Sequence, residues 1–148
     1  MECYNFQYAV KFMCGQWESE ALAPGKYFTA INVHNPTDGD VIFRYKVAVA
    51  LSPGEQGPKS DFAYLPLGSD LALEIDCPVI MDILRKIPYE KEFAKGFVVI
   101  ETDVELDVVA VYTAAGGRER QVVSIHMERV APRRPIRLPH FDSRPDQG

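Results

Sequence analysis

Two of the three cysteines and one of the three histidines are the side chains of this chain with the broadest chemical range. Cys14, Cys77 and His34 each lie near the end of a segment with alternating apolar residues, where a fold can gather side chains. Two thiolates and an imidazole suit zinc or copper. The two cysteines could instead form a disulfide between sheets, or remain as buried free thiols. We favour buried free thiols and keep the disulfide and the metal site as alternatives.

The surroundings of His34 favour a structural role. The residue stands in VHNPTDGD, directly before a stretch rich in turn formers. A histidine in this position most often hydrogen-bonds the backbone of the loop, so we do not expect it to be catalytic.

Two further groups of residues suit recognition of a partner. Trp17 follows the first alternating segment in a loop-like stretch, where it is either an exposed binding anchor or a side chain folded over the edge of the core. Arg133, Arg134 and Arg137 lie in RRPIRLP, which is similar to Arg- and Pro-rich docking segments. A solubilising or packing tail explains the same arginines equally well.

The chain contains no motif that specifies a reaction. It has no GxSxG motif, no glycine-rich phosphate loop and no HExxH motif. These three motifs mark the usual nucleophile, phosphate-binding and zinc-protease sites. Asp103, Glu105 and Asp107 alternate through a predicted turn but lack the fixed glycine and the glutamate of a calcium loop. We therefore assign no catalytic residue and no cofactor, and lean towards a protein that is not an enzyme.

Composition and charge restrict the class of protein. The chain has 148 residues, of which 47% are hydrophobic and 25% are charged, as in an ordinary soluble domain. No apolar run reaches the roughly 20 residues needed to cross a membrane, and the first residues lack the basic region, the apolar region and the cleavage site of a signal peptide. We expect a cytoplasmic protein without membrane insertion. The net charge is −5, and an acidic body argues against nucleic-acid binding.

Alternating apolar residues predict strands along most of the chain. We expect strands near 6–14, 27–34, 41–51, 62–65, 71–76, 96–102, 106–114 and 121–130, and a loop over 52–60. The turn formers at 35–40 predict a hairpin between the second and third strands, and those around Asp103 predict another hairpin. This pattern indicates an all-β fold, an antiparallel β-sandwich of about seven or eight strands.

One segment has helical spacing instead. Val79, Ile80, Ile83, Leu84 and Ile87 follow an i, i+3, i+4 pattern, which predicts a short helix near 78–87 that caps one end of the sandwich. After Val130 the alternation stops. We therefore expect a sandwich domain over 1–130 and a Pro- and Arg-rich tail over 131–148, extended or disordered.

Five motifs together resemble a known group of proteins. YAVKFMCG (8–15), INVHNP (31–36), LALEIDC (71–77), KGFVVIE (95–101) and ELDVVAVYTA (105–114) are similar, in sequence and order, to a group of uncharacterised bacterial β-sandwich proteins. That resemblance implies the fold and no activity. GFVVIETDVELDVVAVYT also resembles a strand pair of the sensory rhodopsin transducer family, which implies a soluble, cytoplasmic, oligomeric sandwich that acts through partner binding.

These observations favour a non-catalytic binding or assembly module, which we expect to form a homo-oligomer. Several apolar residues fall on predicted outward positions, namely Ile42, Val109 and Val111, where another subunit can cover them. The first alternative is a metal- or thiol-dependent protein that uses Cys14, Cys77 and His34. The second is a signalling protein that binds a protein partner through its basic tail.

Overall fold

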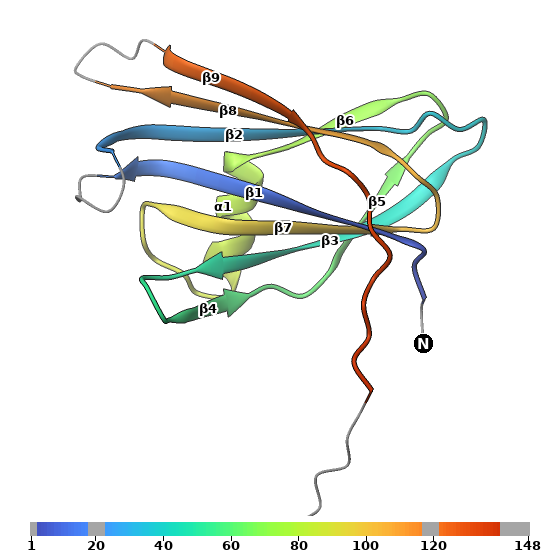
Figure 1. The fold of residues 1–148 in the computed structure, drawn as a ribbon, viewed down its shortest axis with the longest axis horizontal. Helices are drawn as coiled ribbons and strands as arrows, with labels where there is room; N and C mark the ends of the chain where they lie inside the picture. The colour runs from blue at the N-terminus through green and yellow to red at the C-terminus, as the bar shows by residue number, and fades with distance from the viewer. Residues whose placement is uncertain (1–2, 18–22, 117–121, 140–148) are drawn as a thin grey trace, which may run out of the picture.

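Strands make up most of the structure, a computed structural model that describes residues 3–17, 23–116 and 122–139. The elements are β1 (Phe6–Trp17), β2 (Gly25–His34), β3 (Val41–Ala50), β4 (Gln56–Lys59), β5 (Ala63–Leu67), β6 (Ala72–Asp76), α1 (Cys77–Lys86), β7 (Ala94–Thr102), β8 (Asp107–Ala115) and β9 (Val122–Arg129) (Figure 1). The all-β, sandwich-like fold predicted from the sequence is confirmed.

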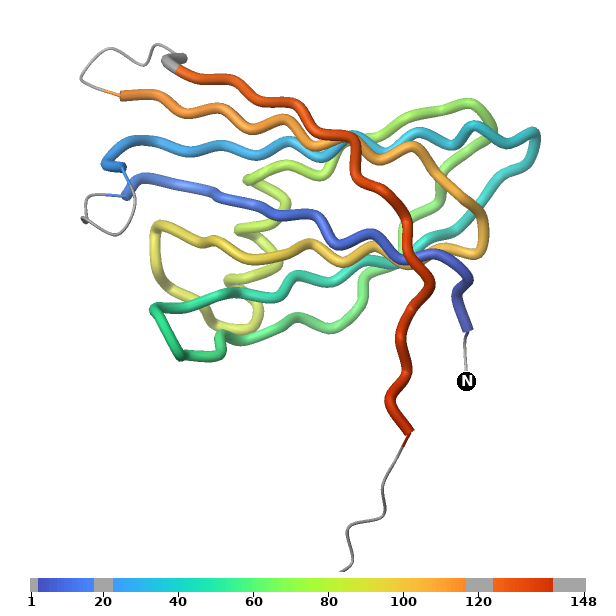
Figure 2. The backbone as a smooth tube through the Cα atoms, viewed as in Figure 1, coloured from blue at the N-terminus to red at the C-terminus, as the bar shows by residue number. Residues whose placement is uncertain are grey.

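The strands form one antiparallel sheet that is bent and not closed. Their order along the main path is β4-β3-β7-β1-β2-β8-β9, with β5 paired to β3 and β6 paired to β2. We call the β1, β3, β4, β5 and β7 part sheet A and the β2, β6, β8 and β9 part sheet B. Figure 2 shows the chain passing back and forth between the two parts.

Strand β1 belongs to both sheets, and Gly15 makes this possible. Residues 6–14 pair with β7, whereas residues 15–17 pair with β2. Gly15 has φ +108°, and a Cβ at this position would collide with the carbonyl oxygen of Glu92. Only glycine adopts this backbone readily and leaves that space empty. The change of sheet therefore depends on a residue without a side chain.

The core lies between the inward faces of the two sheets, as the alternation predicts. Phe12 and Val10 of β1, Phe43 of β3 and Ile31 of β2 are almost fully buried. Tyr8 is buried as well, and its hydroxyl donates to the Leu106 carbonyl (2.8 Å) and accepts from the Leu106 N–H (2.9 Å). This pair of bonds ties β1 to the segment between β7 and β8.

Both predicted hairpins are wrong, although the turns themselves are present. Strand β2 pairs with β1, β6 and β8, whereas β3 pairs with β4, β5 and β7. Strands β7 and β8 likewise lie in different sheets. Turn residues reverse the chain, but they do not decide whether the next strand pairs with the previous one or crosses the core to the facing sheet. Here the chain crosses in both cases.

The segment 52–60, predicted as a loop, contains the short strand β4. It pairs with β3 through Ala48↔Lys59 and Ala50↔Gln56, with a shift of register between them. Pro58 is tolerated because β4 lies at the end of the sheet, where one edge needs no partner.

The single helix of the described residues confirms the prediction near 78–87. The Asp76 side chain accepts a hydrogen bond from the Val79 N–H at its beginning, and Ile80 and Leu84 are buried. The helix contacts strands of both sheets, and Figure 1 shows it behind them. In the described part of the chain, no helix has the length and apolar character that a membrane crossing requires.

Candidate functional site

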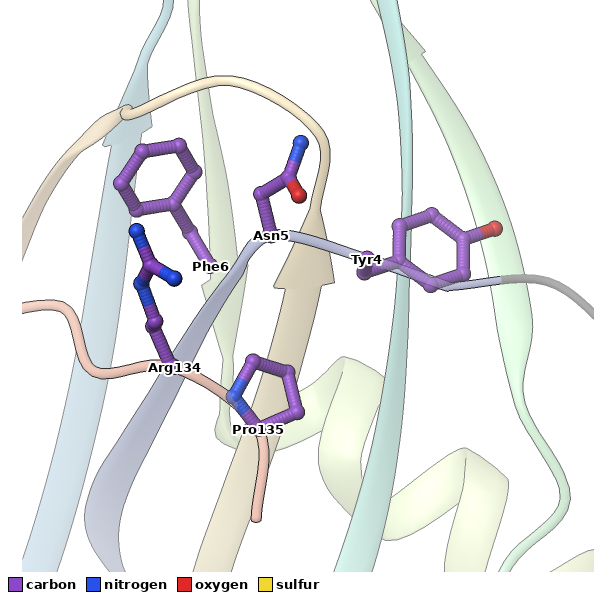
Figure 3. Close-up of a pocket in the computed structure, with 5 residues that line it drawn as sticks. All are labelled: Tyr4, Asn5, Phe6, Arg134 and Pro135. Carbon is purple, nitrogen blue, oxygen red and sulfur yellow. The ribbon is translucent and has the colours of Figure 1, made fainter. Parts of the chain in front are cut away.

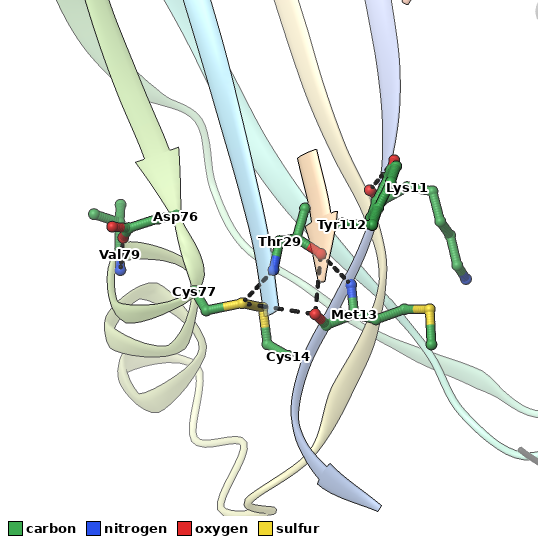
Figure 4. Close-up of a disulfide and its surroundings, with 8 residues drawn as sticks. All are labelled: Lys11, Met13, Cys14, Thr29, Asp76, Cys77, Val79 and Tyr112. Atoms are coloured by element: carbon green, nitrogen blue, oxygen red, sulfur yellow. Dashed lines mark hydrogen bonds between the residues drawn. A yellow bond between two sulfur atoms is a disulfide. The ribbon is translucent and has the colours of Figure 1, made fainter. Parts of the chain in front are cut away.

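Cys14 and Cys77 form a disulfide (Figure 4). Their Cα atoms lie 5.5 Å apart, at the point where β1 leaves sheet A and where β6 passes into α1. Both residues are buried, as predicted, but the favoured interpretation as free thiols is wrong. The sequence does not show that the two cysteines lie close together, because they are 63 positions apart.

Thr29 forms hydrogen bonds with the disulfide and with the neighbouring residue Met13. The Thr29 N–H donates to Cys77 Sγ at 3.1 Å. The Thr29 hydroxyl accepts from the Met13 N–H (2.9 Å) and donates to the Met13 carbonyl (3.0 Å). The two bonds between Thr29 and Met13 join β2 to β1 next to the disulfide.

The structure does not bring His34 to the two cysteines. Its Nδ1 lies 2.9 Å from Asp107 Oδ2 and its Nε2 lies 2.9 Å from Asp70 Oδ1. The histidine therefore binds two carboxylates rather than the loop backbone that we expected. Since each sulfur is bonded to the other, the thiolates of the proposed zinc or copper site are not available. Among the described residues, no three His, Cys, Asp or Glu side chains are grouped to hold a metal ion.

Two carboxylates determine the charge of His34. Hydrogen bonds to Asp107 and then to Asp70 raise the pKa of its imidazole above the usual value of 6.5. When both ring nitrogens face carboxylates, both must donate, which requires the imidazolium form. Such a ring cannot accept a proton, so His34 fits a structural clamp and not a general base.

Trp17 is the last residue of β1, and it lines a cavity of about 290 Å³. Its ring packs on Phe93 with centroids 4.9 Å apart. Leu51, Tyr89 and Lys95 also line the cavity. The indole Nε1 is buried and has no hydrogen-bond partner among the described residues. Trp17 thus folds over the edge of the core and yet borders an open space.

The described part of the tail lies against β1. Gln7 and Arg133 exchange two backbone hydrogen bonds, of 2.7 and 2.9 Å, and Arg133 Nε donates to Gln7 Oε1 at 2.8 Å. Arg134 and Pro135 line a cavity of about 380 Å³ together with Tyr4, Asn5 and Phe6, and Figure 3 shows the Arg134 side chain beside the Phe6 ring. Arg137 is exposed. Arg133 is therefore bound to the body, while Arg134 borders a hollow.

The outer face of sheet B carries a patch of apolar side chains. Strand register places Val111 of β8 opposite Met127 of β9 and Ala30 of β2, and Val109 opposite Arg129 and Asn32, and directly opposed residues share one face. We call Phe28, Val109, Val111, Ile125 and Met127 the apolar patch. Met127 is 65% exposed; the sequence alone gives no sign of its place in the patch, because it joins Val111 only through the pairing of β9 with β8.

Comparison with known proteins supports the fold alone. No protein-family model and no curated protein matches this chain. A solved structure that is similar is the crystal structure of Thermotoga maritima 1070, with a TM-score of 0.55 over 88% of this chain and 96% of that chain. The two sequences are 10% identical, so the likeness carries no residue role or activity from one to the other.

Proposed function

We propose that this protein is a non-catalytic module that assembles with copies of itself through the apolar patch. The observation that carries the proposal is the combination of this patch with a free sheet edge. Phe28, Ile125 and Met127 are each exposed, and Val109 and Val111 beside them are half-buried. Contiguous apolar surface of this kind is a common mark of a protein interface.

Strand β9 supplies the free edge. It ends the strand order, and among the described residues no strand pairs with its outer side. Its side chains from Ser124 to Arg129 are all exposed. A long, exposed edge strand with apolar side chains on one face is a template for pairing with another chain.

A second copy fits this edge through two-fold symmetry. In an antiparallel β9–β9 pair centred on His126, Ile125 of one copy lies opposite Met127 of the other. Ser124 lies opposite Glu128 in the same register, so no like charges face each other there. A two-fold interface requires a self-complementary surface of this kind. The pairing continues sheet B into the second copy and extends the apolar patch across the junction.

Light scattering coupled to size-exclusion chromatography tests the assembly. We expect the untreated protein to elute at a multiple of its chain mass of 16.6 kDa, and Met127→Glu to elute at that mass because a carboxylate cannot be buried unpaired. Ile42→Glu is the matched control: Ile42 is 64% exposed but lies on sheet A. A monomeric untreated protein, or a dimer unaffected by Met127→Glu, would contradict the proposal.

Cross-linking tests the register. His126→Cys, in a Cys3→Ser background that removes the exposed free thiol, should form a disulfide between copies under mild oxidation. Glu74→Cys, placed on exposed β6 of the same sheet, should not. Equal cross-linking of both variants would show that collisions and not a defined pair of strands bring the copies together.

The two alternative functions, metal- or thiol-dependent chemistry and partner binding through the tail, have less support than self-assembly. A metal- or thiol-dependent activity needs Cys14 and Cys77 as thiolates, and both are used in the disulfide. Recognition of a partner through the basic tail stays a prediction. Its test is deletion of residues 131–148, which should abolish partner binding without unfolding the body if the tail is the binding element.

A further inference from the structure

The outer face of sheet A carries lysines from four neighbouring strands. Strand register aligns Lys11 of β1 with Phe97 of β7 and Ala48 of β3, and Ala48 in turn with Lys59 of β4. The same register places Lys46 opposite Val99 and Lys95 opposite Met13. We call Lys11, Lys46, Lys59 and Lys95 the basic face. Its members surround a floor of small and apolar side chains.

Among the described residues, no acidic side chain forms an ion pair with one of these four lysines. Glu101 is the carboxylate on the outward positions of these paired strands, and it accepts from Arg44 Nη2 at 2.7 Å and from Gln7 Nε2 at 3.0 Å. Lys11 is partly buried, and this burial, together with repulsion from Lys95, lowers the pKa of its ammonium group. A net positive face on a chain of charge −5 shows that the charges are segregated.

The basic face continues into the cavity bordered by Trp17. Lys95 belongs to both, and Lys91 adds a second ammonium group to the cavity wall. The remaining wall is largely apolar, with Leu51, Pro53, Tyr89 and Phe93 among its residues. The wall is held in shape, because the Tyr89 hydroxyl donates to the Phe93 carbonyl at 2.9 Å.

The indole N–H of Trp17, which has no hydrogen-bond partner among the described residues, is a second, independent observation at this place. A buried N–H without an acceptor is unfavourable, and most such groups in native proteins find a partner. An acceptor on a bound molecule would satisfy it. The cavity of about 290 Å³ lies at the lower limit for ligand sites, and is therefore suited to one side chain rather than to a large cofactor.

We propose that sheet A binds an acidic polypeptide segment of another protein, which inserts one apolar side chain into the cavity of Trp17 and lays its carboxylates along the basic face. The chemistry of each part selects this partner. A small molecule cannot contact all four lysines at once, because they lie on four strands and neighbouring strands are about 4.8 Å apart. The apolar cavity requires an anchor that a simple polyanion lacks. This surface is separate from the apolar patch of sheet B, so it does not depend on self-assembly.

Trp17 is the single tryptophan of the chain, and its fluorescence reports directly on the cavity. The probe is the peptide acetyl-EEEFEEE-amide, titrated into the full chain at low salt. We expect a saturable change of the Trp17 emission that acetyl-EEEAEEE-amide produces much more weakly and acetyl-KKKFKKK-amide does not produce. Added salt should weaken the binding, because exposed charges are screened beyond roughly 10 Å at 0.1 M ionic strength.

Charge reversal separates the basic face from general electrostatics. Lys11→Glu and Lys46→Glu should each raise the dissociation constant about tenfold, since attraction between surface charges becomes repulsion. Lys86→Glu is the matched control: it changes the net charge equally, but Lys86 is exposed at the end of α1. Unchanged circular dichroism of each variant shows that the fold is retained.

Four results would overturn the inference. They are equal binding of the acidic and the basic peptide, an equal effect of Lys86→Glu and Lys11→Glu, binding of benzoate as tight as that of the anchored peptide, and tighter binding of oligothymidylate than of the peptide. Benzoate would point to a small-molecule site, and oligothymidylate would point to single-stranded nucleic acid. Loss of self-assembly in Met127→Glu with peptide binding retained would leave the inference intact.

Discussion

At the scale of single residues, His34 shows how placement determines chemistry. The same imidazole could ligate a metal, accept a proton or carry a charge. Its two nitrogens lie 2.9 Å from Asp70 and 2.9 Å from Asp107, and Arg129 lies 3.9 Å from the other oxygen of Asp107. These contacts select the charged form. They also tie the end of β2 to the turn before β6 and to the beginning of β8.

His34 should make the stability of the protein depend on pH. Its pKa is raised in the folded state, so its stabilising contribution is complete below the unfolded pKa of about 6.5. It is lost as the pH rises through the raised folded pKa. We expect urea unfolding to show a fall in stability above pH 6.5 that is absent in His34→Gln. A His34 imidazole signal in NMR that titrates below pH 6.5 would contradict this prediction.

The turn formers after His34 predicted a structural role for it, but they did not indicate which residues it contacts. In the sequence, Asp107 is one of three alternating acidic residues, and no motif or pattern around Asp70 indicates a contact with His34. Both carboxylates reach His34 because β2 pairs with β8, where His34 is opposite Asp107, and with β6, where His34 is opposite Ala72, two residues after Asp70. Pairing between strands distant in sequence created the clamp.

At the scale of elements, the change of sheet in β1 depends on one position. Gly15→Ala should lower the unfolding free energy by about 2–4 kcal/mol, because alanine at positive φ is strained and its Cβ meets the Glu92 carbonyl. Gly54→Ala is the matched control, since Gly54 has φ +81° with nothing within 4 Å of the added Cβ. Equal losses in urea unfolding would show that backbone strain alone accounts for the effect.

The elements themselves were largely predictable. A period of two places the buried residues of β1 and β3 on one face, and helical spacing locates α1. Strand β4 was not predictable, because QGPK contains both glycine and proline and has the composition of a loop. It becomes a strand only because the edge of β3 is there to pair with it.

At the scale of the whole molecule, the disulfide connects sheet A to the beginning of α1. Closing a loop of 63 positions removes chain entropy from the unfolded state, worth about 4 kcal/mol. Cys77→Ala should lower the unfolding free energy by about that amount, and reductant should reproduce the effect in the untreated protein but not in the variant.

Cys3→Ser is the control for the disulfide, since Cys3 is exposed and free and its loss should leave stability unchanged. A thiol titration of the denatured, unreduced protein should find one reactive thiol per chain. Three reactive thiols would show that the disulfide does not form in the protein as purified.

The two surfaces we propose also exist only at this scale. Val109 and Val111 indicated an outward apolar strip from sequence, but Met127 and Phe28 joined it through strand register. The basic face could not be predicted from the sequence, because its four members lie far apart along an acidic chain, at Lys11, Lys46, Lys59 and Lys95. An overall charge of −5 gave no sign that one face is positive.

The amino-acid sequence by itself determined the strands other than β4, the one helix, and which side of each of these strands faces the core. These properties are local, because the alternation of side chains along a strand and the spacing of apolar residues along a helix lie within a few residues of each other. Tertiary structure alone decided which strands pair, that two turns cross the core, that Cys14 meets Cys77, and which charges share a face. Those properties depend on contacts between distant residues, and local periodicity contains no information about them.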